Sequence, residues 1–384
     1  MPGEILELQI DKVVYGGDGL GRVNGQTIFV PFSAPGDHLR VRVVESRRSY
    51  KRAVIEEIIT PSSMRRPAPC PHFGICGGCQ IQHLNYQAQL ESKVGFVKES
   101  LRRIGHIEWT QEIPIIHADE WGYRARAQFK VDYKKRIGFY RGSSHEVEDL
   151  ASCPLLRQEL NDELTKLRNE RDLLDNVEEV EVATADEGIS KDVDLLDEPA
   201  AITQSVGDLK YRFDVRTFFQ VNPNLLDRMI EAAVGKATGD LAVDLYCGVG
   251  LFTVPLSKRF REVIAVEGNE RSARYAAGNV ELNGSSNVSV YDSSIEDWLV
   301  RNSGGSHELD FLLLDPPRAG VEANALGDLI AIKPAAVAYV SCDPTTLARD
   351  LRAFIAAGYS IESITAIDMF PQTFHVETCV RLRR

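Results

Sequence analysis

The sequence predicts a multidomain chain in three parts: a small OB-like β-barrel over residues 1–62, a central α+β domain over 63–210, and a Rossmann-like α/β domain over 211–384. Three observations support this division. Short runs rich in branched residues, separated by Gly and Pro turns, occupy the first part. Three cysteines crowd into residues 70–79 of the second part. In the third part, apolar runs of strand length alternate with helix-like segments, which indicates a parallel sheet with helical crossovers.

Composition limits the class of protein. With 384 residues the chain is long enough for two or three domains and a large core. No apolar run is long enough to cross a bilayer and no charged-then-apolar leader is present, so we expect a soluble, cytoplasmic monomer without a membrane partner. The seven cysteines are an odd number, which favours metal binding or catalysis in a reducing compartment over a disulfide framework.

The net charge of −12 argues at first sight against a polyanionic partner, but charge is unevenly spread along the chain. Most of the excess acid lies in residues 146–198, which we expect to form a solvated face turned away from such a partner. Local patches set the field that a polyanion meets, and the cations gather in two clusters. The first contains Arg40, Arg42, Arg47, Arg48, Lys51, Arg52, Arg65 and Arg66, and the second contains Arg124, Arg126, Lys130, Lys134, Lys135, Arg136 and Arg141.

The first part contains four strand-like runs, ILELQIDKVV, QTIFVPF, HLRVRVVES and RAVIEEII. Gly-rich and Pro-Gly turns separate them, which predicts a small closed barrel. The segment RRSYKR (47–52) places an aromatic among cations, which suits a phosphate backbone and a stacked base, although a solvated strand end has the same composition. The GGDGLGR and VPFSAPGD turns resemble the TRAM domain, a module appended to many RNA-modifying enzymes, so RNA binding is expected here.

The second part opens with CPHFGICGGCQIQH, which contributes Cys70, Cys76 and Cys79, and Cys153 follows far downstream. Four thiolates can hold either a tetrahedral zinc ion or an iron–sulfur cluster. The two glycines between Cys76 and Cys79 let the backbone wrap closely around a bulky centre, which favours a [4Fe–4S] cluster. The alternative is a set of buried cysteines without a ligand.

Three further segments are expected in the central domain. Residues 86–105 have the pattern of an amphipathic helix, and a second helix is expected over residues 155–174. Between them, YRARAQFKVDYKKRIGFYR (123–141) predicts a basic β-hairpin with aromatics among its cations. Such strands suit an RNA surface, and an ordinary half-buried sheet is the alternative.

The third part begins its sheet with LAVDLYCGVGLFTVPLS, a strand followed by a turn containing Gly248 and Gly250 and then a helix. This spacing is not the dinucleotide G-x-G-x-x-G and has no P-loop lysine. The next strand ends in Glu267, which is placed to accept both hydroxyls of a ribose. Asp292 follows a third strand, near where an adenine would lie. A glycine-rich first turn and an acid ending the second strand are the layout of S-adenosylmethionine methyltransferases.

Two later strands end in chemically reactive residues. FLLLDPPRAG ends a strand at Asp315, and AVAYVSCDPTTLARD ends another before Cys342. Ligands of parallel sheets gather at the carboxyl ends of the strands, so the acid and the thiol are expected at one edge. A cysteine is often a small buried apolar residue. Because Cys342 lies in the turn after the strand, we interpret it as a reactive thiol.

Together with FFQVN (218–222) and DMFPQTFHVETCVRL (368–382), these motifs identify the chain as a member of the RNA uracil-5-methyltransferase family, which makes 5-methyluridine. The TRAM-like turns and the four cysteines resemble the iron–sulfur subgroup that acts on 23S ribosomal RNA. The resemblance implies that Cys342 is the nucleophile and Glu377 the base. It also implies that the cofactor and uracil pocket is lined by Gln220, Tyr246, Glu267 and Asp315.

The chemistry requires these residue types independently. C5 of uracil is too poor a nucleophile to attack a sulfonium, but a thiolate that adds at C6 makes an enolate that can take the methyl group. A carboxylate must then remove the C5 proton before the thiol is eliminated. Asp315 is placed to hydrogen-bond the uracil edge. The target base must first be swung out of any stack, which explains RNA-gripping appendages.

Other functions remain as alternatives. Transfer RNA is the alternative target within the same family. A cytosine-5 or amino-group methyltransferase is a second enzymatic reading, but amino methylation usually places an aromatic where this chain has Arg318 and needs neither Cys342 nor Glu377. An inactive, metal-stabilised RNA-binding scaffold is the non-enzymatic alternative, against which the intact Cys342, Glu377 and Asp315 argue.

Overall fold

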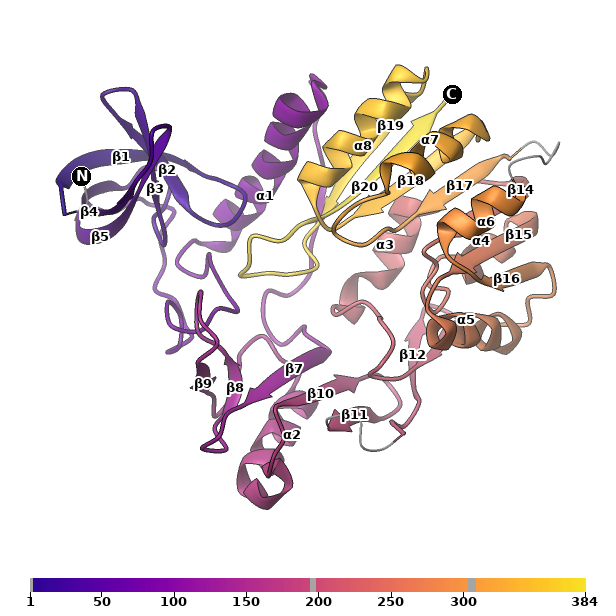
Figure 1. Cartoon of the computed structure of the whole chain (residues 1–384), viewed down its shortest axis with the longest axis horizontal. Coiled ribbons are helices and arrows are strands. Elements are labelled where there is room, and N and C mark those ends of the chain that lie inside the picture. Colours follow the sequence, from indigo (N-terminus) through magenta and orange to yellow (C-terminus); the bar gives the residue numbers. More distant parts are fainter. Residues whose placement is uncertain (1–2, 194–197, 303–308) are drawn as a thin grey trace.

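The computed structural model describes residues 3–193, 198–302 and 309–384. Figure 1 shows a small barrel on one side, a large sheet flanked by helices on the other, and a smaller sheet below both. No helix in the described ranges is long and apolar enough to cross a membrane.

The first part is a closed five-stranded barrel, as the sequence predicts. Its strands alternate between buried apolar and exposed polar residues, so one face of each fills the barrel. Around the barrel the order is β1-β2-β3-β5-β4. The strands are β1 (Ile5–Val13), β2 (Gly19–Val23), β3 (Gln26–Val30), β4 (His38–Ser46) and β5 (Tyr50–Thr60).

The C-terminal domain is built on an eight-stranded sheet of order β16-β15-β14-β17-β18-β20-β19-β6. The strands from β16 to β18 run parallel, whereas β20 is antiparallel to both of its neighbours. The strands are β6 (Ile115–Ile116), β14 (Gly239–Leu245), β15 (Phe260–Glu267), β16 (Val288–Asp292), β17 (Phe311–Leu314), β18 (Ala336–Ser341), β19 (Ser360–Ile367) and β20 (Glu377–Arg383).

Helices cover both faces of this sheet, and the strands therefore bury side chains on both sides. In β17, for example, Leu312 and Leu314 face one apolar core while Phe311 and Leu313 face the other. The helices are α3 (Leu226–Ala233), preceded by the 3₁₀ turn η3 (Pro223–Leu225), α4 (Thr253–Ser257), α5 (Glu270–Leu282), α6 (Ile295–Asn302), α7 (Ala323–Ala331) and α8 (Pro344–Ala356). The α/β expectation for this part is confirmed.

The predicted amphipathic helix is α1 (Tyr86–Ser100), which continues into the π-helical turn η1 (Leu101–Gly105). It packs against the C-terminal domain, since Val97 and Leu101 belong to one of the two cores of that sheet. The short strand β6 (Ile115–Ile116) then pairs with β19 at the edge of the same sheet. This segment, which the sequence groups with the central domain, is thus attached to the C-terminal one.

The central sheet has the order β11-β10-β7-β8-β9. The expected basic hairpin is present as β7 paired antiparallel with β8, and the expected helix as α2 followed by the 3₁₀ turn η2. A separate hairpin, β12–β13, crosses the predicted domain limit at residue 210. These elements are β7 (Arg126–Val131), β8 (Ile137–Tyr140), β9 (Val147–Asp149), α2 (Gln158–Asn169), η2 (Arg171–Leu174), β10 (Glu179–Thr184), β11 (Ile189–Val193), β12 (Ile202–Val206) and β13 (Leu209–Phe213).

Candidate active site

A cavity of about 800 Å³ opens at the carboxyl edge of the C-terminal sheet. Seven of the nine predicted catalytic and cofactor-binding residues line it: Cys342, Glu377, Gln220, Tyr246, Gly248, Glu267 and Asp315. Gly250 and Asp292 are not among its lining residues. Gly250 has φ +91° and sits behind the turn, against Ala276 of α5. Asp292 is exposed at the end of β16, opposite Glu267 in the strand register.

The cofactor side of the cavity is a turn joined to the end of the second strand. Tyr246 and Gly248 both adopt positive φ, at 62° and 55°, in the turn after β14. Glu267, at the end of β15, accepts a hydrogen bond from the Gly248 amide at 2.8 Å and another from the Asn269 amide at 2.8 Å. The predicted ribose-binding acid and the glycine-rich turn are therefore held together before any ligand binds.

Asp244, in the strand that leads into this turn, stabilises the start of the following helix. It was not identified from the sequence as a site residue. Its side chain is fully buried and accepts a hydrogen bond from Thr253 Oγ1 at 2.5 Å. Burial raises the pKa of Asp244 to about 7. The residue follows the strand pattern of an ordinary core position, so only its polarity distinguishes it.

The nucleophile and base are placed side by side by the antiparallel strand β20. Ser341, the last residue of β18, lies opposite Thr378. Cys342, one position further, therefore lies beside Glu377, the first residue of β20. Because β20 runs against the other strands, its amino end reaches the edge where theirs end.

The carboxyl groups of Glu377 and Asp315, which lie near Cys342, are shielded from water. Burial raises the pKa of Glu377 to about 7, and the Arg318 guanidinium opposes this shift. Burial raises the pKa of Asp315 well above its usual range, and the neighbouring Glu377 raises it further. Both groups are thus able to hold a proton near neutral pH.

The surroundings of Cys342 raise the pKa of its thiol. A thiol at the amino end of a helix often has a lowered pKa, but burial and the Glu377 carboxyl raise the pKa of Cys342 to about 11. The helix amides are already satisfied, because the Asp343 side chain caps α8 by accepting from the amides of Thr345 and Thr346. In the RNA-free protein the thiol is therefore protonated.

Arg318 and Phe218 complete the cavity and were missed as site residues. Arg318, after the two prolines of the β17 turn, lines the cavity and lowers the pKa of Cys342 by its charge and hydrogen bonding. It also approaches the His375 ring at 3.3 Å. Phe218 is 61% exposed although it is a large apolar residue, so it offers an open ring face to a planar ligand.

The loop that leads into Glu377 is held by α1 and its neighbours. Gln372 has φ 72°, an uncommon value for a non-glycine residue. Its amide donates to Gln89 Oε1 at 3.0 Å, and its side-chain oxygen accepts from Gln89 Nε2 at 2.9 Å and from Arg66 at 3.0 Å. These bonds stabilise the strained backbone.

The four cysteines at 70, 76, 79 and 153 line a second cavity, of about 410 Å³. The Gly78 amide lies 3.4 Å from the Cys76 sulfur, so one glycine of the CGGC turn does point its N–H at a thiol. Burial raises the pKa of Cys79 to about 12. Over the ranges that the structure describes, no group of three or more His, Cys, Asp or Glu side chains is gathered as a single metal ion requires.

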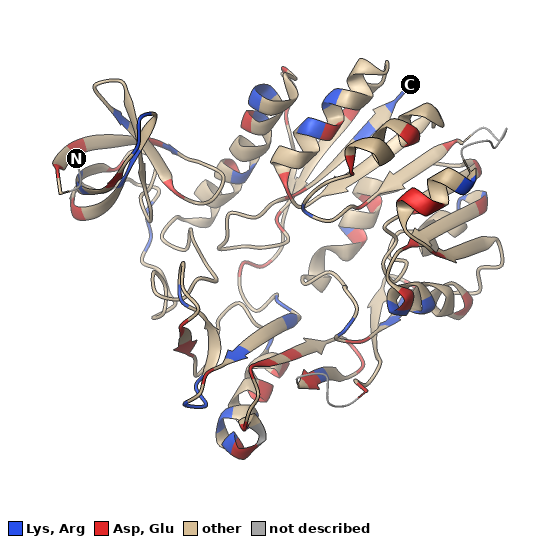
Figure 2. Cartoon of the chain, in the orientation of Figure 1, with Lys and Arg blue, Asp and Glu red and all other residues tan. Residues whose placement is uncertain are grey.

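The two basic clusters are largely paired with acids. In the barrel Arg40 pairs with Glu7 and Glu57, and Arg42 with Glu56. The other pairs are Arg47–Glu45, Lys51–Glu4, Arg52–Asp18, Arg65–Asp37, Arg66–Glu120, Arg126–Glu181, Lys130–Glu179, Lys135–Asp175, Arg136–Asp132 and Arg141–Glu148. Figure 2 shows both signs of charge intermixed over the barrel and the central sheet.

The acidic stretch is not turned away from the basic hairpin. Its strand β10 pairs antiparallel with β7, which puts Glu179 opposite Lys130 and Glu181 opposite Gln128. Strand β10 thus completes the same sheet as the basic hairpin, and the orientation of the acidic stretch away from RNA stays a prediction. Phosphate groups would have to compete with these carboxylates for the cations.

The fold and cavity define the chain as an S-adenosylmethionine-dependent RNA methyltransferase. Residues 148–384 match the model of the tRNA (uracil-5-)-methyltransferase family, and residues 1–55 match the TRAM domain. The chain belongs to this family and carries a TRAM domain at its amino end.

Relatives span the whole chain. An uncharacterized RNA methyltransferase of Aquifex aeolicus is 33% identical over 426 residues, covering 100% of this chain and 99% of that protein. Another, from Synechocystis, is 33% identical over 452 residues, covering 99% and 96%. The crystal structure of Pyrococcus abyssi tRNA (uracil-54, C5)-methyltransferase with S-adenosyl-L-homocysteine is similar with a TM-score of 0.75 and 25% identity, covering 98% of this chain and 100% of that one.

Proposed function

We propose that this protein transfers a methyl group from S-adenosylmethionine to C5 of a uridine in RNA through a covalent adduct between Cys342 and C6. The observation that carries the proposal is the shared cavity: the thiol and the Glu377 carboxyl lie beside each other at the sheet edge, and the glycine-rich turn opens into the same space.

Each residue has a role that follows from its position. The Cys342 thiol first loses its proton to solvent, which the positive charge of Arg318 favours, and the thiolate then adds to C6, which places negative charge on C5 and O4. Asp315, whose pKa burial raises well above its usual range, hydrogen-bonds the N3–O4 edge and stabilises that charge. Phe218 offers its exposed ring to a base that has left its stack. S-adenosylmethionine, when bound, supplies the methyl group as a sulfonium.

Resolution of the adduct depends on Glu377. After methylation C5 carries both the methyl group and a hydrogen, and this hydrogen must leave as a proton. Glu377, with a pKa of about 7, is ionised in enough of the molecules at neutral pH to accept it. The C6–S bond then breaks, the thiolate leaves and the C5–C6 double bond returns.

The test is to trap the adduct. RNA with 5-fluorouridine at the target has no C5 proton to lose, so methylation should give a protein–RNA species that survives a denaturing gel and requires S-adenosylmethionine. Glu377→Gln should trap the adduct on ordinary RNA, whereas Cys342→Ala should form none and lose nearly all turnover. Comparable methylation by Cys342→Ala would overturn the nucleophile assignment.

For the target we propose 23S ribosomal RNA, on the combination of the TRAM domain with the four cysteines. Transfer RNA is a second candidate, favoured by the similar Pyrococcus abyssi structure, whose name gives a transfer RNA uridine as its substrate. Mapping 5-methyluridine in total RNA with and without this protein decides between them. A modified position that appears in transfer RNA alone would overturn the ribosomal proposal.

We further propose that Cys70, Cys76, Cys79 and Cys153 hold a structural [4Fe–4S] cluster. All four line one cavity, and a glycine amide points at a sulfur, as a bound cluster requires. His72 is hydrogen-bonded to Glu148 at 2.8 Å, and His83 is hydrogen-bonded to the Ser33 carbonyl at 3.1 Å. Neither histidine therefore competes with the cysteines as a cluster ligand. The cluster has no step in the methyl transfer.

A further inference from the structure

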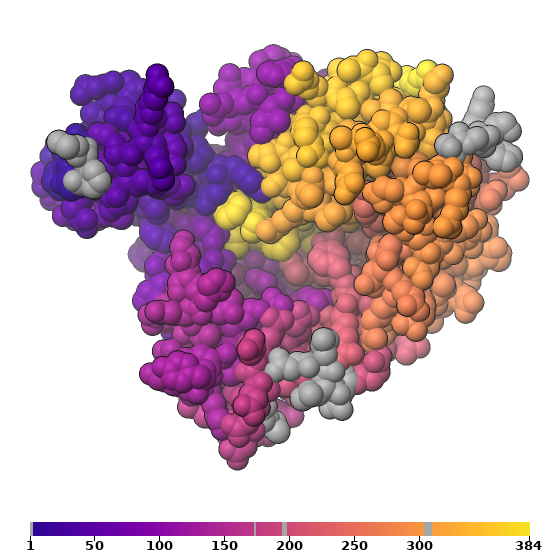
Figure 3. Space-filling model, in the orientation of Figure 1, coloured from indigo at the N-terminus to yellow at the C-terminus, as the bar shows by residue number. Residues whose placement is uncertain are grey.

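The loop between β1 and β2 of the barrel reaches the active site, where Tyr15 contacts the C-terminal domain. Its hydroxyl donates a hydrogen bond to Asp343 Oδ2 at 3.1 Å, and its ring meets Phe374 edge-on, with centroids 5.2 Å apart. A third contact, to Phe96 of α1, has centroids 6.0 Å apart. Figure 3 shows the barrel atoms against the carboxyl-terminal ones at this junction.

The two C-terminal contacts of Tyr15 lie on the two segments that carry the proposed catalytic groups. Asp343 directly follows Cys342, and Phe374 lies three residues before Glu377. The Tyr15 side chain is therefore wedged between the turn of the nucleophile and the loop of the base. A domain that merely gripped RNA would need no such contact.

The hydroxyl completes the hydrogen bonding of Asp343. One carboxylate oxygen accepts from the Thr345 amide at 2.7 Å and from the Thr346 amide at 3.2 Å, and the other accepts from Tyr15. Burial and the Asp343 charge raise the pKa of Tyr15, so the phenol stays neutral and can donate. Because both oxygens are hydrogen-bonded, the Asp343 side chain is held in one orientation. The backbone at Asp343, and with it the position of the neighbouring Cys342, is fixed as a result.

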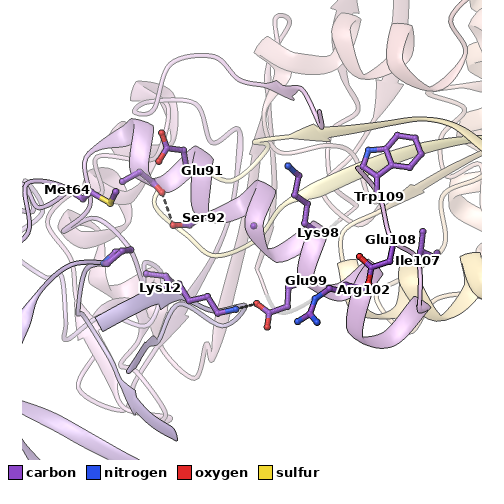
Figure 4. Close-up of a pocket in the computed structure, with 14 residues that line it drawn as sticks. Lys12, Met64, Glu91, Ser92, Lys98, Glu99, Arg102, Ile107, Glu108 and Trp109 are labelled. Atoms are coloured by element: carbon purple, nitrogen blue, oxygen red, sulfur yellow. Dashed lines mark hydrogen bonds and ion pairs between the residues drawn. The ribbon is translucent and has the colours of Figure 1, made fainter. Parts of the chain in front are cut away.

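The loop itself is anchored on both sides. Gly17 has φ +93° and packs so closely that an added Cβ would come within 2.7 Å of Gln80 Cβ. At the end of β1, Lys12 forms an ion pair with Glu99 of α1. Figure 4 shows this pair bridging the barrel and α1 at the edge of a cavity of about 480 Å³. The position of Tyr15 thus depends on how the barrel sits on α1.

We propose that Tyr15 is a positioning residue of the methyl-transfer reaction, which acts through Asp343 and Phe374 to set Cys342 against Glu377. The barrel is then a part of the active site as well as an RNA-binding module. The kinetic part of this proposal rests on the proposed function, but the contact with the Cys342 turn does not.

The test is Tyr15→Phe, which removes the hydroxyl and keeps the ring. We expect kcat for RNA methylation to fall about tenfold, as when a hydrogen bond to a charged positioning group is lost, while KM for RNA stays within about twofold. Tyr359→Phe is the matched control, because it also removes one tyrosine hydroxyl bond, to the Pro334 carbonyl at 2.8 Å, and lies past the carboxyl end of α8, at the other end of that helix from the Cys342 turn.

A second readout needs no RNA. The pH profile of Cys342 alkylation by iodoacetamide should move to higher pH in Tyr15→Phe, because the Asp343 charge loses a compensating donor. This arm can succeed even if uridine is not the substrate. In Asp343→Asn the further change Tyr15→Phe should have little effect, since the two act as a unit. An unchanged kcat and alkylation profile, or a raised KM alone, would overturn the proposal, and the last outcome would make Tyr15 an RNA contact.

Discussion

Lys93 and Asp368 form an ion pair in which both side chains are fully buried. Lys93 Nζ also donates to the Phe370 carbonyl at 2.9 Å, and Asp368 accepts from the Tyr86 hydroxyl at 2.9 Å. The pair ties α1 to the beginning of the loop that carries Glu377. A buried pair is costly to desolvate, so its value here is in fixing that loop.

The first prediction is that Lys93→Met destabilises the protein by about 3–5 kcal/mol, because it leaves the Asp368 carboxylate buried without a counter-charge. Denaturant unfolding measures the change. Lys98→Met is the control, since Lys98 is exposed on the same helix. The double variant Lys93→Met/Asp368→Leu should recover most of the stability and still methylate slowly, because the loop has lost its tether. Full activity in the double variant would contradict this role.

The second prediction concerns pH. Glu377 must be ionised to accept the C5 proton, and its pKa in the folded protein is raised to about 7. The methylation rate should therefore be low in acid and increase as the pH passes through about 7. Initial kcat/KM measured from about pH 5 to pH 9 tests this. A rate that is flat across that interval would show that the proton leaves to another group.

Arg318→Met provides the third prediction. The guanidinium lowers the pKa of both Glu377 and Cys342, so its removal should shift the pH–rate profile and the alkylation profile of Cys342 to higher pH. Arg352→Met, at an exposed position of α8, should shift neither. If the rate falls without any shift, Arg318 acts by contacting RNA and not by its field on these groups.

The active site was only partly predictable from sequence. Asp315 and Cys342 each end a parallel strand, so their common edge follows from strand patterns alone. The place of Glu377 does not, because no periodicity shows that β20 runs antiparallel beside β18; it came from a family resemblance. Tyr15 and Asp343 are 328 residues apart, and local patterns carry no signal for such a contact.

Packing partners were less predictable than the elements themselves. The pattern of α1 shows that one face is buried, but not that this face lies on the C-terminal sheet and not on the central one. A run of like charges in the sequence also does not show which strand it pairs with. The acidic strand β10 pairs with basic β7 by register, and a sequence that places Glu181 fifty-five residues from Arg126 gives no sign of it.

The fourth prediction concerns the cysteine cavity. Protein purified without oxygen should be brown and contain about four irons and four sulfides per chain. Cys79→Ala should lose the iron and lower the thermal stability, because cluster binding is coupled to folding. Cys379→Ala, a buried cysteine of β20 outside that cavity, should keep the iron. One zinc and no labile sulfide would contradict the assignment.

The last prediction concerns RNA binding by a protein whose cations are paired. Replacing Arg47, Arg48, Lys51 and Arg52 by Ala should weaken RNA binding and flatten its salt dependence, by roughly one unit of slope for each lost phosphate contact. The structure also predicts that removing an acid paired with these cations should strengthen RNA binding. Glu45 pairs with Arg47 and lies 4.0 Å from Arg52. Because both arginine side chains are exposed, these ion pairs contribute little to the stability of the fold.

Glu45→Gln should therefore bind RNA more tightly and with a steeper salt slope, while kcat at saturating RNA stays unchanged. Glu362→Gln is the matched control, because that exposed glutamate pairs with Arg383 on the C-terminal sheet. Filter binding over a salt series measures both slopes. If the quadruple variant and Glu45→Gln both bind like the parent protein, these four barrel cations do not contact phosphate, and the RNA would have to be held elsewhere, by the basic hairpin of residues 123–141 or by Arg126, Arg216 and Arg318 at the active-site cavity.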